Sequence, residues 1–74
     1  MVSKQDETFL AIAQAGSVSK AAQGLYLSQP AVSRSLKRLE EDLGVQLFDR
    51  EAAPLRLTQA GERFLSYTNR ILGL

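Results

Sequence analysis

Hydrophobic positions in the first 25 residues recur at helical spacing, in two groups separated by a glycine. In the first group, Phe9, Ile12 and Ala13 lie three and four residues apart, which places them on one face of a helix. This helix is expected to end at Gly16, because glycine readily takes the left-handed conformation found just past helix ends. Ser17 is then a suitable N-cap for a second, short helix. The apolar face of that second helix comprises Val18, Ala21, Ala22 and Leu25.

A third periodic segment begins after Ser28, the next candidate N-cap. Pro30 follows within the first turn, where its missing N–H costs the helix no hydrogen bond. The segment closes at Gly44. Its apolar stripe consists of Val32, Leu36, Leu39 and Leu43. The pattern therefore predicts three successive helices, with a very short turn between the second and the third.

The period of the pattern changes after the third helix. Val45–Arg50 and Leu55–Thr58 are short segments that favour strands, and they flank Glu51–Pro54. They predict a two-stranded hairpin with Pro54 at the turn or at the entry to a strand. Such a hairpin must pack against the helices, because an isolated one is not stable in water.

A fourth helix is predicted after the hairpin, with Thr58 as its N-cap. No stop signal is evident before the chain ends at Gly73–Leu74. The apolar side of this helix comprises Phe64, Leu65, Ile71 and Leu72, with Thr68 between them. The predicted fold is mainly α: a winged helix-turn-helix with three helices, a two-stranded wing and a C-terminal helix.

Composition removes several classes of function. The chain has 74 residues, no cysteine and no histidine, so a disulfide scaffold, a thiolate metal cluster and a histidine base are all excluded. No convergent set of acids or activated serines replaces them, so neither an enzyme nor a bound cofactor or metal is expected. No apolar run reaches the roughly 18 residues of a membrane span. The net charge of +1 gives no argument from bulk charge for a nucleic-acid partner, so any such argument depends on where the charges lie.

The charges of the third helix are distributed unevenly. An advance of about 100° per residue places its leucines on the core side, within about 40° of Val32. The opposite side, near the helix start, is small or basic, whereas Glu40, Glu41 and Asp42 lie in the last turns. A helix with a cationic N-terminal half is suited to enter a major groove by that end, where its dipole also attracts phosphate. The outer residues are Pro30, Ala31, Ser33, Arg34, Lys37 and Arg38.

A second interpretation of the same charges stays open. Lys37 with Glu41 and Arg38 with Asp42 are spaced as i,i+4 ion pairs, which are typical of a solvated helix face. Periodicity cannot decide between this interpretation and DNA binding.

The residues themselves resemble the N-terminal domain of the LysR-type transcriptional regulators. The resemblance runs from about Phe9 to the end of the chain. Its most specific part is the Ser-Gln-Pro-Ala-Val-Ser stretch at 28–33, followed at family spacing by Leu39-Glu40, Leu43-Gly44, Leu47-Phe48 and Thr58-Gln59-Ala60-Gly61. Further matches are Phe9 to Ala13, Gly16-Ser17, Ala21-Ala22 and Arg50.

The resemblance implies a mode of DNA binding. The helix at about 28–43 would enter the major groove, the start of the preceding helix would touch the backbone, and the wing at about 46–58 would reach toward a minor groove. Gln29 could pair with adenine, and Arg34 could contact guanine or phosphate. The residues implied are Ser17, Ser19, Lys20, Ser28, Gln29, Pro30, Ala31, Ser33, Arg34, Lys37, Arg38, Arg50 and Arg56.

The resemblance also implies a dimer that binds an interrupted palindrome. Residues 1–58 would form the DNA-binding domain, and residues 59–74 would begin a linker helix that pairs with its counterpart in a second subunit. The expected seam is Phe64, Leu65, Thr68, Ile71 and Leu72. The alternative for this face is packing against the chain's own first helix, and each is expected to hold in part.

Three departures from the family pattern change the expectations. Ser3 and Asp6 are polar where the family usually has leucine, so the first helix is expected to start late or to fray. The wing carries Glu51 beside Arg50 and has Ala53 where a cation is common, so minor-groove contact should be weaker, and the salt dependence of DNA binding shallower, than in a typical member of the family. No effector-binding domain follows the linker helix, so no small-molecule effector is expected to act on this chain.

The expected partners are therefore double-stranded DNA and a second copy of the chain, in the bacterial cytoplasm and not at a membrane. The alternative is a winged-helix protein-interaction module without DNA recognition, which the near-neutral charge and the acidic wing favour.

Overall fold

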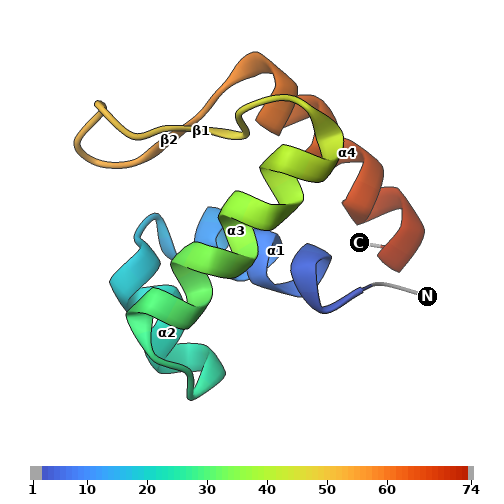
Figure 1. Ribbon diagram of the computed structural model, residues 1–74. Coiled ribbons are helices and arrows are strands. Elements are labelled where there is room, and N and C mark those ends of the chain that lie inside the picture. Colours follow the sequence, from blue (N-terminus) through green and yellow to red (C-terminus); the bar gives the residue numbers. More distant parts are fainter. Residues whose placement is uncertain (1–2, 74) are drawn as a thin grey trace.

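A computed structural model describes residues 3–73 of the chain. The element order is α1 (Lys4–Ala15), α2 (Val18–Leu25), α3 (Gln29–Leu43), β1 (Phe48–Asp49), β2 (Arg56–Leu57) and α4 (Gln59–Leu72). α1 contacts each of the other three helices, and Figure 1 shows α2 and α4 on opposite sides of it. The hairpin formed by β1 and β2 extends away from the helices (Figure 1). This arrangement is the winged helix-turn-helix that the sequence predicts.

The core lies where the apolar faces of the three first helices meet the base of the wing. Phe9 is fully buried there, and its ring lies 5.4 Å from that of Phe48 and 5.0 Å from that of Phe64. These two contacts join α1 to the wing and to α4, so one aromatic side chain links three parts of the fold. The buried hydrophobic residues are Phe9, Leu10, Ile12, Ala21, Ala22, Val32, Leu36, Leu39, Leu47 and Phe48.

Polar caps fix the starts of all four helices. The hydroxyls of Ser17, Ser28 and Thr58 each accept a hydrogen bond from a backbone N–H three residues ahead, as the sequence predicts. Ser3 does the same for α1, accepting from the N–H of Asp6. The expected late start of α1 is therefore wrong, because the polar residues at positions 3 and 6 form a cap and an acidic first turn.

The wing is shorter than the pattern predicts. Only Phe48 pairs with Leu57 and Asp49 with Arg56, in antiparallel register. The reason lies before the strand, where the backbone N–H groups of Leu47 and Phe48 point to a side chain of α3 and not along the sheet. The segment predicted from Val45 therefore forms a ladder over two residues only.

α4 begins in a confined space and ends at a glycine. A Cβ atom at Gly61 would overlap the backbone carbonyl of Leu47 and lie 2.9 Å from a methyl carbon of Leu57, so only glycine fits this close approach. At the other end Gly73 takes the left-handed conformation and caps the helix. The helix thus has the stop that the sequence interpretation did not find.

Candidate nucleic-acid interface

The N-terminal half of α3 presents an exposed polar and basic surface. Gln29, Pro30, Ser33 and Arg34 are exposed, and Ala31 is half-buried. Arg34, Lys37 and Arg38 also line a depression of about 470 Å³, together with Gln5, Ser35 and Glu41. The three cations of α3 that the sequence predicts to face a ligand therefore lie on one side of the helix.

Neither i,i+4 ion pair expected of a solvated helix face forms within 4 Å. Among residues 3–73, the one ion pair joins Arg50 to Glu40. Lys37 and Arg38 therefore form no ion pair with the acids one turn further along, although Glu41 lines the same depression. This geometry favours an exposed cationic surface over a salt-bridged one.

Two of the predicted contact residues, Ser17 and Ser28, are also the N-caps of helices. Ser17 accepts a hydrogen bond from the N–H of Lys20 at 3.1 Å, and Ser28 accepts one from the N–H of Ala31 at 3.2 Å. Both hydroxyl oxygens are thereby occupied in capping α2 and α3, although each hydroxyl hydrogen remains free to donate. Ser19 and Lys20 are exposed beside the first of these caps.

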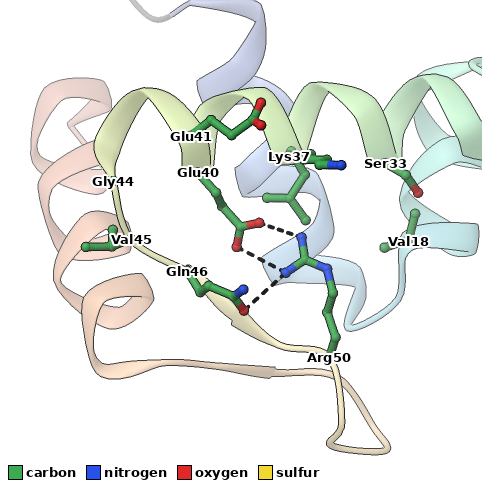
Figure 2. A pocket seen from close by; sticks show the side chains of 10 residues that line it. Val18, Ser33, Lys37, Glu40, Glu41, Gly44, Val45, Gln46 and Arg50 are labelled. Atoms are coloured by element: carbon green, nitrogen blue, oxygen red, sulfur yellow. Dashed lines mark hydrogen bonds and ion pairs between the residues drawn. The ribbon is translucent and has the colours of Figure 1, made fainter.

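A cleft of about 650 Å³ separates α3 from the wing. Figure 2 shows Ser33 and Lys37 of α3, Val18 of α2 and Arg50 of the wing around it. Residues from three segments distant in the chain are therefore brought together, as the sequence-based interpretation requires for one ligand surface. The floor of the cleft is formed partly by Glu40.

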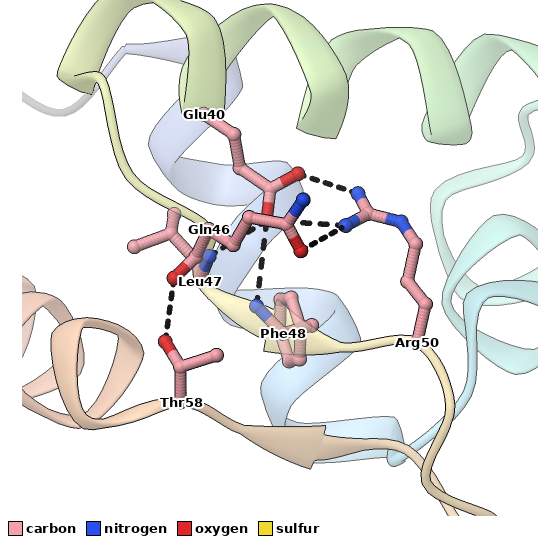
Figure 3. A network of polar contacts seen from close by, with 6 residues as sticks. All are labelled: Glu40, Gln46, Leu47, Phe48, Arg50 and Thr58. Carbon is pink, nitrogen blue, oxygen red and sulfur yellow. Dashed lines mark hydrogen bonds and ion pairs between the residues drawn. The ribbon is translucent and has the colours of Figure 1, made fainter.

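Glu40 joins α3 to the wing (Figure 3). Its Oε2 accepts hydrogen bonds from the N–H of Leu47 at 2.6 Å and of Phe48 at 3.4 Å. Its Oε1 lies 2.5 Å from Nη2 of Arg50, and the other terminal nitrogen lies 3.5 Å from Oε2. The residue is only 7% exposed, so its assignment to the outer acidic end of the helix is corrected.

The side chain of Arg50 makes contacts that the sequence did not predict. The sequence-based expectation directs it outward toward a minor groove, whereas its guanidinium lies back against Glu40 and donates to Gln46 Oε1 at 3.5 Å. The buried carboxylate attracts the cation, which explains the difference. Arg56, which is exposed on β2 opposite Asp49, is the other predicted wing cation and has no such contact within 4 Å.

The predicted dimer seam on α4 divides into two parts. Phe64 and Leu65 pack against the core, and Thr68 is 1% exposed with its hydroxyl donating to backbone carbonyls of its own helix. The alternative of packing within the chain therefore holds for these three. Ile71 and Leu72 remain exposed, at 46% and 41%.

Sequence reasoning missed two residues of these surfaces. Tyr67 is 52% exposed on α4 and, with Leu43 and Val45, lines a shallow groove of about 320 Å³. It lies four residues before Ile71, and that spacing was a signal available in the sequence. Glu40 belongs to the Leu39-Glu40 match with the family, but its burial had no signal in the sequence, because it depends on where the wing folds back.

The part of the chain that the structure describes contains no helix that is both long and apolar enough to span a membrane. It also contains no group of three or more acidic side chains placed to hold a metal ion.

A family model for bacterial regulatory helix-turn-helix proteins of the lysR family matches residues 3–62. Among sequence relatives, a probable RuBisCO transcriptional regulator of Cyanidioschyzon merolae is 52% identical over 66 residues. The transcriptional regulator MetR of Haemophilus influenzae is 46% identical over the same length. Each alignment covers 89% of this chain but 22% and 21% of the relative, so the chain spans about a fifth of their length.

Solved structures agree with the sequence relatives. The fold matches the crystal structure of a BenM_DBD/catB site 1 DNA complex with a TM-score of 0.92 and 36% identity, covering 99% of this chain and 82% of that one. It matches a CbnR_DBD–DNA complex with a TM-score of 0.88 and 42% identity, covering 99% and 84%. Because the family model spans most of the chain and the fold agrees with these domains, the chain belongs to the lysR family of bacterial regulatory helix-turn-helix proteins.

Proposed function

We propose that this chain binds double-stranded DNA with sequence specificity, as the DNA-binding domain of a transcription regulator. The observation that carries the proposal is the exposed basic surface of α3, whose cations form no ion pair, beside the cleft between α3 and the wing. The likeness to domains solved as DNA complexes supports it.

In this proposal α3 enters the major groove by its N-terminal end. Gln29 and Arg34 contact base edges, and Ser33 lies close enough to contribute. Lys37 and Arg38 contact phosphates, as do Ser19 and Lys20 at the start of α2. Ser17, Ser28, Pro30 and Ala31 shape the helix starts against the backbone, and Arg56 is the wing residue nearest to a minor groove.

A homodimer is the second part of the proposal. Tyr67 and Ile71 lie one turn apart on α4 and are exposed, as is Leu72 at its end; we call these three residues the α4 seam. Burial of this seam against a second copy is favourable, and two copies would place two α3 helices on the half-sites of an interrupted palindrome. Residues 1–58 then form the DNA-binding domain, and residues 59–74 begin the dimerisation helix.

The regulator to which this domain belongs is proposed to work in the bacterial cytoplasm, where its DNA is. The effector of such a regulator would bind outside residues 1–74, since the chain spans about a fifth of its relatives.

The test is a selection from a random duplex pool, at low and at physiological salt. Enrichment of a short palindromic pair is expected. Arg34→Ala should weaken binding to the enriched duplex by about 1–3 kcal/mol if Arg34 contacts a base. Arg63→Ala on α4 removes the same charge away from the basic N-terminal half of α3 and is the matched control.

Each outcome decides between roles. An equal loss on enriched and random duplex would place Arg34 on the backbone only. Binding at low salt without enrichment of any sequence would mean that the chain contacts phosphates but does not recognise a base sequence. Absence of binding at both salts would overturn the proposal in favour of a winged-helix protein-interaction module.

A further inference from the structure

One edge of the Arg50 guanidinium is held in place. Its two terminal nitrogens contact the two carboxylate oxygens of Glu40, at 2.5 Å and 3.5 Å, and one of them also contacts Gln46. Because Glu40 is bound in turn by two backbone N–H groups of the wing, the carboxylate itself has a fixed position. A planar guanidinium that is paired in this way has little rotational freedom.

The other edge of the guanidinium remains available. The side chain of Arg50 is 46% exposed, whereas that of Glu40 is 8% exposed. Arginine has five N–H donors, and the contacts with Glu40 and Gln46 do not use them all. In Figure 2 the guanidinium borders the cleft between α3 and the wing, with Lys37 and Ser33 on the α3 side.

We propose that Glu40 is a positioning residue that holds Arg50 as a fixed ligand for a DNA phosphate, with Lys37 on the opposite side of the cleft. The inference rests on the proposed function and assigns Arg50 to the backbone between the two grooves. Minor-groove contact by the wing is then left to Arg56. A preorganised donor binds phosphate at a smaller entropic cost than a free side chain does.

Removal of the charge of Glu40 tests the inference, because the two explanations predict opposite changes in DNA affinity. A carboxylate near DNA repels phosphate, so removal of its charge should tighten binding if long-range electrostatics alone matters. If Glu40 instead fixes the guanidinium, the neutral variant should bind more weakly although the chain has gained one unit of positive charge.

The first experiment measures binding to a random-sequence duplex of about three helical turns across a series of salt concentrations. Arg50→Gln should lower the slope of log affinity against log salt by about 0.9 for each bound chain, because one phosphate contact is lost. Arg63→Gln is the charge-matched control on α4 and should leave the slope nearly unchanged. Far-UV circular dichroism confirms that each variant is folded at the temperature used.

The second experiment tests the positioning. Glu40→Gln should bind the same duplex several-fold more weakly than wild type. Arg50→Lys keeps the charge but not the two-pronged geometry, so it should weaken binding while keeping the salt slope. The double variant Glu40→Gln/Arg50→Gln leaves no buried charge unpaired, and it should fold and show the lowered slope of Arg50→Gln.

Three results would overturn the inference: an unchanged slope in Arg50→Gln, tighter binding in Glu40→Gln, or wild-type affinity in Arg50→Lys. If Glu40→Gln does not fold, the Arg50→Lys result decides. Failure of the wild-type chain to bind any duplex at low salt would instead overturn the proposed function itself, so the two failures are distinguishable.

Discussion

α3 and α4 follow the same local rules but present opposite surfaces. Each is an amphipathic helix of similar length, with a hydroxyl N-cap and a left-handed glycine at its C-terminal end. The outer face of α3 is polar and basic, whereas that of α4 keeps Tyr67, Ile71 and Leu72 exposed. The inner faces build the core in both cases, so the outer faces distinguish a surface for nucleic acid from one for protein.

The helices also differ in how their ends meet the wing. α3 begins in solvent and reaches the wing at its far end, through the carboxylate of Glu40. α4 begins against the wing, with Gly61 packed on the carbonyl of Leu47. Substitutions at the start of α4 are therefore expected to destabilise the fold, whereas its C-terminal end is free to contact a partner. For α3 we expect the opposite: its start is free to contact a partner, and its C-terminal end is held by the wing.

The largest effect is expected at the start of α4. Gly61→Ala places a methyl group against backbone, which cannot move aside as a side chain can, and should destabilise the fold by about 2–3 kcal/mol. Thermal unfolding followed by circular dichroism measures the loss. An unchanged midpoint would show that α4 can shift away from the wing without cost.

An intermediate effect is expected on the α4 seam. Ile71→Glu should weaken self-association at least about tenfold, because a charge would be buried in an apolar contact, and should change monomer stability little. Sedimentation equilibrium measures the association. Ser66→Glu introduces the same charge on another side of α4 and should leave association intact; equal loss in both variants would point to net charge and not to the seam.

The smallest effect is expected in α2, at a glycine that has open space around it. Outside its chain neighbours and the backbone of its own helix, no atom lies within 4 Å of a Cβ built on Gly24, so Gly24→Ala should stabilise the chain by about 0.5–1 kcal/mol through helix propensity alone. Glycine to alanine is therefore expected to raise the free energy of unfolding at position 24 and to lower it at position 61. A destabilising result at Gly24 would mean that its surroundings are more crowded than the fold indicates.

The helices could be predicted from the sequence because their signals are local. Ser17, Ser28 and Thr58 each cap the helix that follows, and Gly16 and Gly44 each end the helix that precedes them. The cap at residue 3 is equally local, but it was hidden by a comparison with a family pattern that has leucine there. Polar residues at positions 3 and 6 replace a hydrophobic contact with a hydrogen-bonded cap.

The wing and its attachment could not be predicted in the same way. Helical periodicity places Glu40 at the flank of the apolar stripe, and no local rule states whether a flank is covered. Its burial follows from the path of residues 45–50, which return along α3 and present two N–H groups to it. The direction of Arg50 depends on that same path, so both assignments required the tertiary structure.

The link between Glu40 and Leu47 has a further consequence for the order of folding. It spans only seven positions of the chain, so the entropy lost on closing this loop is small. The edge-to-face contact of Phe9 with Phe64 instead joins the first helix to the last and closes a long loop of the chain. The wing can therefore attach as soon as α3 exists, and the start of α4 follows it through the short link from Gly61 to Leu47, whereas the contact of α4 with α1 closes the longest loop. A partly opened chain can then keep its helix-turn-helix and wing together after α4 has separated from α1.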